Sequence, residues 1–316
     1  MVLPRFEVIE PKTISEVCIE LARLKNSNVR LLAGGTDLFV DIRKKILPEH
    51  LPRCSGCPPE SNDPQVPMKP PEFLISLSRI NELKGIYVDE STISIGAMTT
   101  ITELTESDII GKYLGALAQG ADSLGSPLVR NRGTIGGNIA NARPAADTFI
   151  PAVALEGTIC VSSSDGNREI PADSFAEGPG QTVLKKNEFI THLIFEKYRN
   201  KYGSAYQKLA NRKALEISTI SVGAFLLLSD DLKGIEKARI ALGAVGPTPI
   251  LATNAMNYLQ GKEHAESIFN EASKLAAKDA KPITDHRSSR EYRLEMVEVI
   301  TKRVLDFALK RALKRN

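Results

Sequence analysis

Apolar residues in the first part of the chain form short runs separated by segments with helical spacing. Val29–Leu32 is typical of a short buried strand, and Leu38–Val40 with Ile42 begins a helical pattern. Thr13 and Glu16 have the spacing of a capping box ahead of an amphipathic helix. Helix and strand therefore alternate, and the pattern predicts a βα-type opening.

Short elements continue through the middle of the chain. Its apolar runs are brief and are separated by glycine, proline and polar residues, which favours many short strands and helices over a few long ones. The pattern predicts strands at 73–77, 86–88, 91–95 and 158–162, and helices at 102–110, 113–123 and 147–155.

From residue 189 onward the apolar runs are longer. They predict strands at 189–195, 204–210, 218–228 and 238–245, followed by helices at 254–259, 265–277 and 289–311. Strands followed by helices indicate an α+β domain with an antiparallel sheet and its helices on one face. The predicted organisation is a domain over 1–186, divided into two lobes near residue 70, and a second domain over 187–316.

Two glycine doublets about a hundred residues apart interrupt this pattern, one in the segment 33–38 and one in 134–141. A residue without Cβ lets the backbone approach a diphosphate, and successive N–H groups in such a turn form a positive concavity. A single doublet is more often a tight turn. A pair favours dinucleotide binding, because both doublets are flanked by side chains that can donate to phosphate, namely Thr36, Thr134, Asn138 and Asn141.

Other nucleotide sites are excluded by their missing motifs. The chain has neither a G-x-G-x-x-G fingerprint after its first strand nor a G-x-x-x-x-G-K-[ST] loop, which argues against a Rossmann nicotinamide site and against nucleoside triphosphate hydrolysis. Asp147 precedes an apolar helical segment. It could cap that helix or accept hydrogen bonds from a ribose hydroxyl, and both roles are open.

Composition and charge narrow the class of protein further. The chain has 316 residues, 42% of them hydrophobic, and a formal net charge of +3. This length suits two or three compact units, and the near-neutral charge gives no electrostatic reason to expect nucleic acid as a partner. No apolar run is long enough to span a bilayer and the N-terminus lacks the apolar core of a signal peptide, so we expect a cytoplasmic protein without membrane insertion.

Three ordered motifs resemble one family. AGGTDL, TIGGNIANARPAAD, and the spacing of Tyr206, Lys208 and Arg212 are similar to the FAD-binding medium subunits of molybdenum hydroxylases, the group of carbon monoxide, xanthine and nicotinate dehydrogenases. The resemblance runs from Phe6 to the last predicted helix, and the second motif is its most specific part. It implies a two-lobed FAD-binding domain of the vanillyl-alcohol-oxidase (PCMH-like) type, followed by an α+β domain that covers the flavin.

The resemblance also implies roles for single residues. Asp147 would be the adenosine-side carboxylate, Lys208 a flavin-side lysine, and Ile217 the aliphatic residue over the isoalloxazine, with Leu124 as a further ring-packing position. For Lys208 the alternative is a strand lysine that points to water. The FAD diphosphate would be wrapped by Leu31, Leu32, Ala33, Gly34, Gly35, Thr36, Asp37 and Leu38, and the second half of its cradle supplied by Thr134, Gly136, Gly137 and Asn138.

The implied function is electron transfer. A large partner subunit with the molybdenum cofactor would oxidise the substrate, iron–sulfur clusters in a small partner would relay the electrons, and FAD on this chain would collect them for an external acceptor such as NAD, oxygen, a quinone or ferredoxin. No catalytic residue and no metal site are expected in this chain. The alternatives are a stand-alone FAD-dependent reductase and a flavin-binding scaffold without turnover.

Two features stay open. The segment 44–71 is an insertion relative to the family, and Cys54, Cys57 and His50 within it could form an exposed dithiol, a metal site within the chain or a site shared with a partner. Arg130 and Arg132, just before the second doublet, could approach the FAD phosphates or face the iron–sulfur partner.

Overall fold

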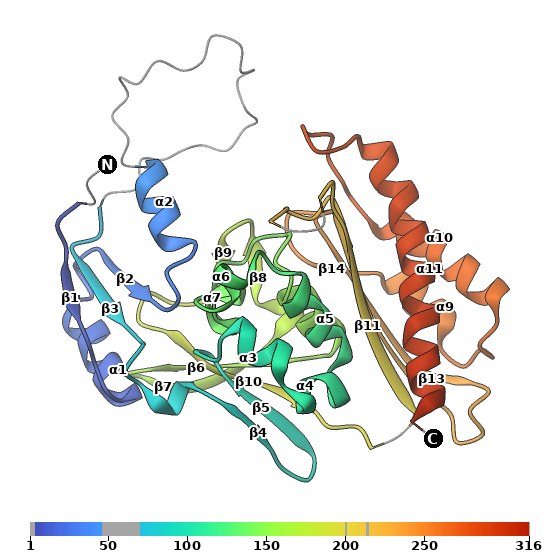
Figure 1. The fold of residues 1–316 in the computed structure, drawn as a ribbon, viewed down its shortest axis with the longest axis horizontal. Helices are drawn as coiled ribbons and strands as arrows, with labels where there is room; N and C mark the ends of the chain where they lie inside the picture. The colour runs from blue at the N-terminus through green and yellow to red at the C-terminus, as the bar shows by residue number, and fades with distance from the viewer. Residues whose placement is uncertain (1–3, 46–69, 200, 213–214, 316) are drawn as a thin grey trace.

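The computed structural model describes residues 4–45, 70–199, 201–212 and 215–315, and the predictions on Cys54, Cys57 and His50 lie outside these residues. Three layers follow one another along the long axis of the molecule (Figure 1). An N-terminal lobe, a middle layer and a C-terminal domain each contain their own β-sheet.

The N-terminal lobe comprises β1 (Glu7–Ile9), α1 (Ile14–Arg23), β2 (Val29–Leu32), α2 (Leu38–Lys45) and β3 (Phe73–Ser76). Its strands form a parallel sheet in the order β1-β3-β2. Thr13 caps α1 as predicted, but the Glu16 carboxylate accepts from the Lys12 N–H and does not reach back to Thr13. Since β3 is the central strand of this sheet, we propose that the lobe includes it and ends after Ser76 instead of near residue 70.

The middle layer is built on a five-stranded antiparallel sheet. Its strands, in spatial order, are β4 (Ile86–Val88), β5 (Thr92–Gly96), β10 (Phe189–Glu196), β6 (Thr158–Ser163) and β7 (Gly166–Pro171). The pattern assigned 189–195 to the C-terminal sheet, and this assignment is wrong because β10 pairs with both β5 and β6. We therefore propose a domain boundary between Glu196 and Tyr202 in place of 186/187.

The middle layer also contains short helices. They are η1 (Asn81–Leu83), α3 (Ile101–Glu106), α4 (Asp108–Tyr113), α5 (Gly115–Ser123), α6 (Pro127–Arg130), α7 (Ile135–Ala140), α8 (Phe149–Ala154) and η2 (Ala172–Ser174), with the hairpin β8 (Ala176–Gly178) and β9 (Gln181–Thr182) after them. The predicted single helix over 102–110 is two helices. Ser107 ends α3, and its side chain accepts from the Ile110 N–H to begin α4.

The C-terminal domain is an antiparallel sheet of β11 (Tyr202–Leu209), β12 (Ile220–Leu228), β13 (Ile235–Gly243) and β14 (Ile250–Leu251), followed by α9 (Thr253–Leu259), α10 (Glu266–Asp279) and α11 (Arg290–Lys314). The three helices lie on the outer face of the sheet (Figure 1). Helices α5 and α8 of the middle layer pack against β11 and β12. The sheet is therefore covered by the middle layer on one face and by its own C-terminal helices on the other.

Close backbone packing joins α11 to the sheet at Gly203. A Cβ at this position would lie 2.0 Å from the Ala308 carbonyl oxygen and 2.6 Å from the Ala312 nitrogen. Gly111 in α4 has no atom within 4 Å of its ideal Cβ position. A methyl group would therefore clash with the backbone of α11 at Gly203 but would meet open space at Gly111.

We expect Gly203→Ala to lower the free energy of unfolding by about 1–3 kcal/mol, since the added methyl group overpacks the contact with α11. Gly111→Ala is the matched control and should raise it by up to about 1 kcal/mol, because alanine favours the helix and meets nothing. Chemical denaturation of both variants measures the difference. Equal midpoints would show that α11 shifts without cost.

Candidate functional site

The first glycine doublet lies against the backbone of the segment 132–133, directly before the second doublet. A Cβ on Gly34 would be 2.0 Å from the Arg132 carbonyl oxygen and 3.0 Å from the Gly133 Cα. Gly35 has a φ of +74°, the left-handed conformation that favours glycine. Each of these two glycines is thus required by the local backbone, one for close approach and one for its dihedral angle.

The first doublet presents a row of unpaired amides. The N–H groups of Ala33, Gly34, Gly35 and Thr36 donate no hydrogen bond to any described residue. The carbonyl groups behave differently, since Gly35 and Asp37 accept from the first turn of α2, at 3.2 and 2.9 Å. Consecutive N–H groups around a left-handed glycine form a concavity of positive potential that suits an anion.

Leu31 and Leu32 lie at the end of β2, and Leu38 is the first residue of α2, so both flanks of the row are fixed by regular structure. Asp37 is exposed in the turn between them. The side chain of Asp41, one turn further, forms an ion pair with Arg143 at 3.4 Å. Arg143 thus connects α2 to the segment that follows the second doublet.

The second doublet is the first turn of helix α7 and differs from the expected phosphate loop. The N–H groups of Ile135, Gly136 and Gly137 already donate, to Thr99 O, Ala97 O and Thr134 Oγ1. A Cβ on Gly136 would lie 2.6 Å from the Ala97 Cβ, so this glycine serves packing against the end of β5.

Two groups near this turn remain able to bind a ligand. The Thr134 hydroxyl accepts from Gly137 N–H at 3.1 Å, and its hydrogen is left to donate. Asn138 Oδ1 accepts from Thr148 at 2.6 Å, and the Asn138 amide hydrogens have no partner among the described residues. The second motif can therefore bind a ligand with its side chains, whereas its first main-chain amides already donate within the protein.

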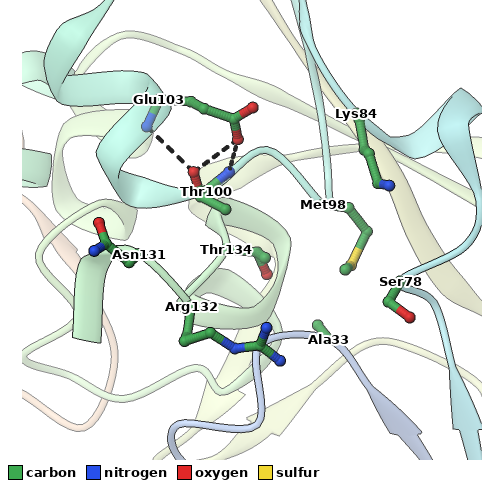
Figure 2. A pocket seen from close by; sticks show the side chains of 10 residues that line it. Ala33, Ser78, Lys84, Met98, Thr100, Glu103, Asn131, Arg132 and Thr134 are labelled. Atoms are coloured by element: carbon green, nitrogen blue, oxygen red, sulfur yellow. Dashed lines mark hydrogen bonds between the residues drawn. The ribbon is translucent and has the colours of Figure 1, made fainter. Parts of the chain in front are cut away.

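A groove of about 380 Å³ opens beside the contact between the first doublet and the segment 132–133 (Figure 2). Figure 2 shows Arg132 and Thr134 across the groove from Lys84 and Ser78, with Ala33 near the Arg132 guanidinium. The full lining is Ala33, Gly34, Ser78, Lys84, Met98, Thr100, Glu103, Asn131, Arg132 and Thr134. All these residues belong to the N-terminal lobe and the middle layer.

A buried polar cluster lies between the middle layer and the C-terminal domain. Asp147, only 8% exposed, accepts from Tyr206 Oη at 2.7 Å and from Lys208 Nζ at 2.9 Å. Ser218 Oγ lies 3.4 Å from the same carboxylate. All three donors come from β11 or the segment before β12, so the carboxylate of one layer is satisfied by the next.

Burial raises the pKa of Asp147, and the Lys208 ammonium together with the hydrogen bonds from Tyr206 and Ser218 opposes that rise. Burial also raises the pKa of Tyr206 well above its ordinary value, and the nearby Asp147 charge adds to the effect. Tyr206 therefore stays a neutral phenol and keeps its proton for the hydrogen bond to Asp147.

This cluster corrects two expectations. Asp147 does not cap α8, since Thr148 occupies the N-cap position and the carboxylate binds the C-terminal domain instead. Lys208 is not a strand lysine that points to water. Asp147 and Lys208 are in direct contact, so their implied roles on two sides of the cofactor stay predictions that a common location must accommodate.

Lys208 also fixes the segment that contains Ile217. Its Nζ donates to the Glu216 carbonyl oxygen at 3.2 Å, and Arg212 Nε donates to the Glu216 carboxylate at 2.5 Å. The Ile217 side chain is 60% exposed next to this anchored carbonyl. Leu215 donates its N–H to the Gly125 carbonyl, which places this segment beside the Leu124 position.

The sequence missed Ser218 as a donor to Asp147 and Arg143 as the partner of Asp41. Ser218 lies directly after Ile217, and Arg143 lies inside the second motif. Both residues are thus next to or within segments that the sequence analysis selected, but no pattern indicated their contacts. Among the described residues, no group of three or more His, Cys, Asp or Glu side chains could hold a metal ion. None of the helices in the described ranges combines the length and apolar character needed to cross a bilayer.

Comparison with known proteins agrees with this arrangement. Residues 64–195 match the family described as the FAD binding domain in molybdopterin dehydrogenase, and residues 204–308 match the CO dehydrogenase flavoprotein C-terminal domain. The carbon monoxide dehydrogenase medium chain of Hydrogenophaga pseudoflava is 32% identical over 98% of both chains. The xanthine dehydrogenase FAD-binding subunit of Escherichia coli O157:H7 is 30% identical over 90% of both chains.

Solved structures show the same fold over the whole chain. A carbon monoxide dehydrogenase structure from Hydrogenophaga pseudoflava that lacks the Mo-pyranopterin moiety superposes with a TM-score of 0.87 and covers 99% of this chain and 100% of its own. The Cu,Mo-CO dehydrogenase in its cyanide-inactivated form gives 0.86 at 27% identity, with the same coverage.

The chain belongs to the family of FAD-binding medium subunits of molybdenum hydroxylases. This confirms the resemblance seen in the three motifs, the predicted fold class and FAD as the cofactor. The protein is an oxidoreductase subunit. The first glycine doublet lies outside both matched ranges, so its part in the site rests on the geometry above.

We expect Lys208→Met to lower the free energy of unfolding by about 3 kcal/mol at neutral pH, because the Asp147 carboxylate loses its counter-charge while it stays buried. Burial already raises the pKa of Asp147, and without Lys208 the pKa should rise further. As the pH falls through that raised pKa, the carboxyl becomes neutral in the folded variant and no longer needs a counter-charge, so the loss should shrink. The unfolded carboxyl stays ionised down to its ordinary, lower pKa.

Chemical denaturation between pH 4.5 and 8 checks this. The double variant Asp147→Asn with Lys208→Met is the control and should recover most of the stability at high pH, since it buries no lone charge. A loss for Lys208→Met that is constant over this pH range would contradict the role given to the pair.

Proposed function

We propose that the row of amides from Ala33 to Thr36 binds the diphosphate of FAD. The carrying observation is that these four N–H groups have no partner among the described residues, in a loop that lies against the segment 132–133 beside the groove. The remaining members of the first motif hold the row in place, Leu31 and Leu32 from β2 and Leu38 from α2. Asp37 contributes its carbonyl to the start of that helix.

In the second motif, Thr134 and Asn138 donate to the cofactor with their side chains. Gly136 and Gly137 act indirectly, because the first lets α7 pack on Ala97 and the second donates to the Thr134 oxygen. The motif is therefore a positioning device for two side chains.

Asp147, Lys208 and Ile217 belong to the flavin end of the site. The salt bridge between Asp147 and Lys208 supports a common location, and the exposed Ile217 lies next to the carbonyl that Lys208 holds. A lysine near the pyrimidine part of a flavin stabilises the negative charge that forms on reduction. Here the negative charge of the adjacent Asp147 carboxylate partly offsets the positive charge of Lys208. The electrostatic effect on the flavin therefore depends on both residues.

The complete function is electron transfer within a multi-subunit enzyme. Relatives named as medium chains support a large partner with the molybdenum cofactor and a small partner with iron–sulfur clusters. FAD supplies the chemistry, since it accepts electrons and releases them to a further acceptor. We infer that this acceptor, of the NAD, oxygen, quinone or ferredoxin class, reaches the isoalloxazine edge between the middle layer and the C-terminal domain, and that the complex is cytoplasmic.

Gly34→Ala tests this function in the assembled complex. The new methyl group would meet the Arg132 carbonyl and push the first doublet away from the segment 132–133, so FAD content should fall. Substrate should still reduce the iron–sulfur centres, whereas reduction of the external acceptor should drop by at least about tenfold, which corresponds to about 1.4 kcal/mol in the barrier. Gly111→Ala serves as the control and should change neither. Full FAD content together with full acceptor reduction in Gly34→Ala would refute the site.

Single variants of the buried pair should shift the flavin midpoint potential in opposite directions. Lys208→Met removes a positive charge and should lower the potential, whereas Asp147→Asn removes a negative charge and should raise it. Shifts on the order of tens of millivolts are expected, since about 30 mV corresponds to about 1.4 kcal/mol for a two-electron couple. Spectroelectrochemical titration of the holo-complex measures them, and unchanged potentials in both variants would remove the pair from the flavin end.

A further inference from the structure

Thr148 is completely buried at the N-cap position of helix α8, yet it does not cap that helix. A threonine at this position ordinarily has an extended backbone, and its hydroxyl accepts a hydrogen bond from an N–H of the first turn. Here the backbone is helical, with φ of −95° and ψ of −20°, and the hydroxyl accepts no hydrogen bond from the described first turn of α8. The place of Thr148 in the helix thus does not explain its hydroxyl group.

Both donors of Thr148 bind one atom of Asn138. Its Oγ1 donates to Asn138 Oδ1 at 2.6 Å, and its main-chain N–H donates to the same oxygen at 3.2 Å. A main-chain N–H can only donate, so the atom it meets must be the oxygen of the carboxamide and not the nitrogen. The carboxamide is therefore held in one orientation, in which Oδ1 has two donors and the NH2 group has no partner among the described residues.

The side chains of Asp147 and Thr148, adjacent in the chain, bind different layers. The Asp147 carboxylate accepts from Tyr206 and Lys208 of the C-terminal domain, whereas Thr148 binds Asn138 in helix α7 of the middle layer. The buried contacts of Asp147 fix the position of this dipeptide. They thereby also fix the two donors that orient Asn138.

We propose that Thr148 is a positioning residue for FAD binding, which turns the Asn138 carboxamide so that its NH2 group donates to an acceptor oxygen of the cofactor. The inference rests on the proposed function, which places Asn138 in the cofactor site. A carboxamide without this hold is able to rotate and present its oxygen, which cannot donate to a phosphate or sugar oxygen. An orientation fixed in advance also avoids the entropic cost of ordering the side chain when the cofactor binds.

The test titrates FAD into the assembled complex after the flavin has been removed. Thr148→Val removes the hydroxyl and should raise the Kd for FAD about 3- to 10-fold, the effect of one neutral hydrogen bond. Thr148→Ser keeps the hydroxyl and should restore a Kd within about twofold of the wild type. Thr301→Val is the matched control, because Thr301 in α11 is also completely buried and its hydroxyl has no partner in the part of the chain that the structure describes. It should leave the Kd unchanged.

A double-mutant cycle separates positioning from a general structural effect of Thr148. In an Asn138→Ala background, Thr148→Val should have no further effect on the Kd, since no carboxamide is left to orient. An equal rise with and without the carboxamide would overturn the inference, and so would an unchanged Kd in Thr148→Val when Asn138→Ala weakens binding. Failure of the proposed function has a different signature, since Asn138→Ala alone would then bind FAD like the wild type and take the role of Thr148 with it.

Asn138→Asp tests the orientation without a change at Thr148. The carboxylate accepts the same two hydrogen bonds from Thr148 but has no hydrogen to donate, and its charge repels a phosphate. The Kd for FAD should therefore rise about tenfold or more. An affinity equal to that of the wild type would show that the cofactor meets an acceptor at this position, which would contradict the orientation assigned to the carboxamide.

Discussion

The arrangement of the molecule depends on one buried carboxylate. Asp147 belongs to the middle layer, yet its three donors come from the C-terminal domain, and a buried charge without donors would cost several kcal/mol. The two layers must therefore dock in one register for the charge to be satisfied. The same contact brings Lys208 to the Glu216 carbonyl and so fixes the segment with Ile217. Docking of the two layers and positioning of the segment with Ile217 therefore depend on the same buried contacts.

The two glycine doublets show that similar sequences can have different physical roles. In the first, a left-handed Gly35 turns consecutive amides toward one side and leaves them unpaired. In the second, the absence of a Cβ at Gly136 allows α7 to pack on Ala97, and the amides are used inside the protein. Two segments with the same glycine doublet thus differ in structure, since one leaves its amides unpaired and the other uses them within the protein.

Much of the fold follows from the sequence, because apolar periodicity predicts the type of most elements and the motifs carry the family. What the sequence lacks is information on pairing between distant strands. The run 189–195 has the same apolar character as the strands after it, and only its pairing with β5 and β6 shows that it belongs to the middle layer. In the same way, Asp147 and Lys208 each had a sensible role alone. Nothing in the sequence indicated their salt bridge, which joins residues 61 positions apart in the chain.

The position of β10 affects how the chain can be made. The central strand of the five-stranded sheet, β10, is the last of its strands in the sequence. Strands β5 and β6 therefore have no partner on that side until β10 is synthesised, about a hundred residues after β5. Until residue 196 has left the ribosome, both strands expose hydrogen-bonding edges, which are sites of aggregation in nascent chains. Translation speed and chaperone capture over this stretch thus become determinants of how much flavoprotein a cell obtains.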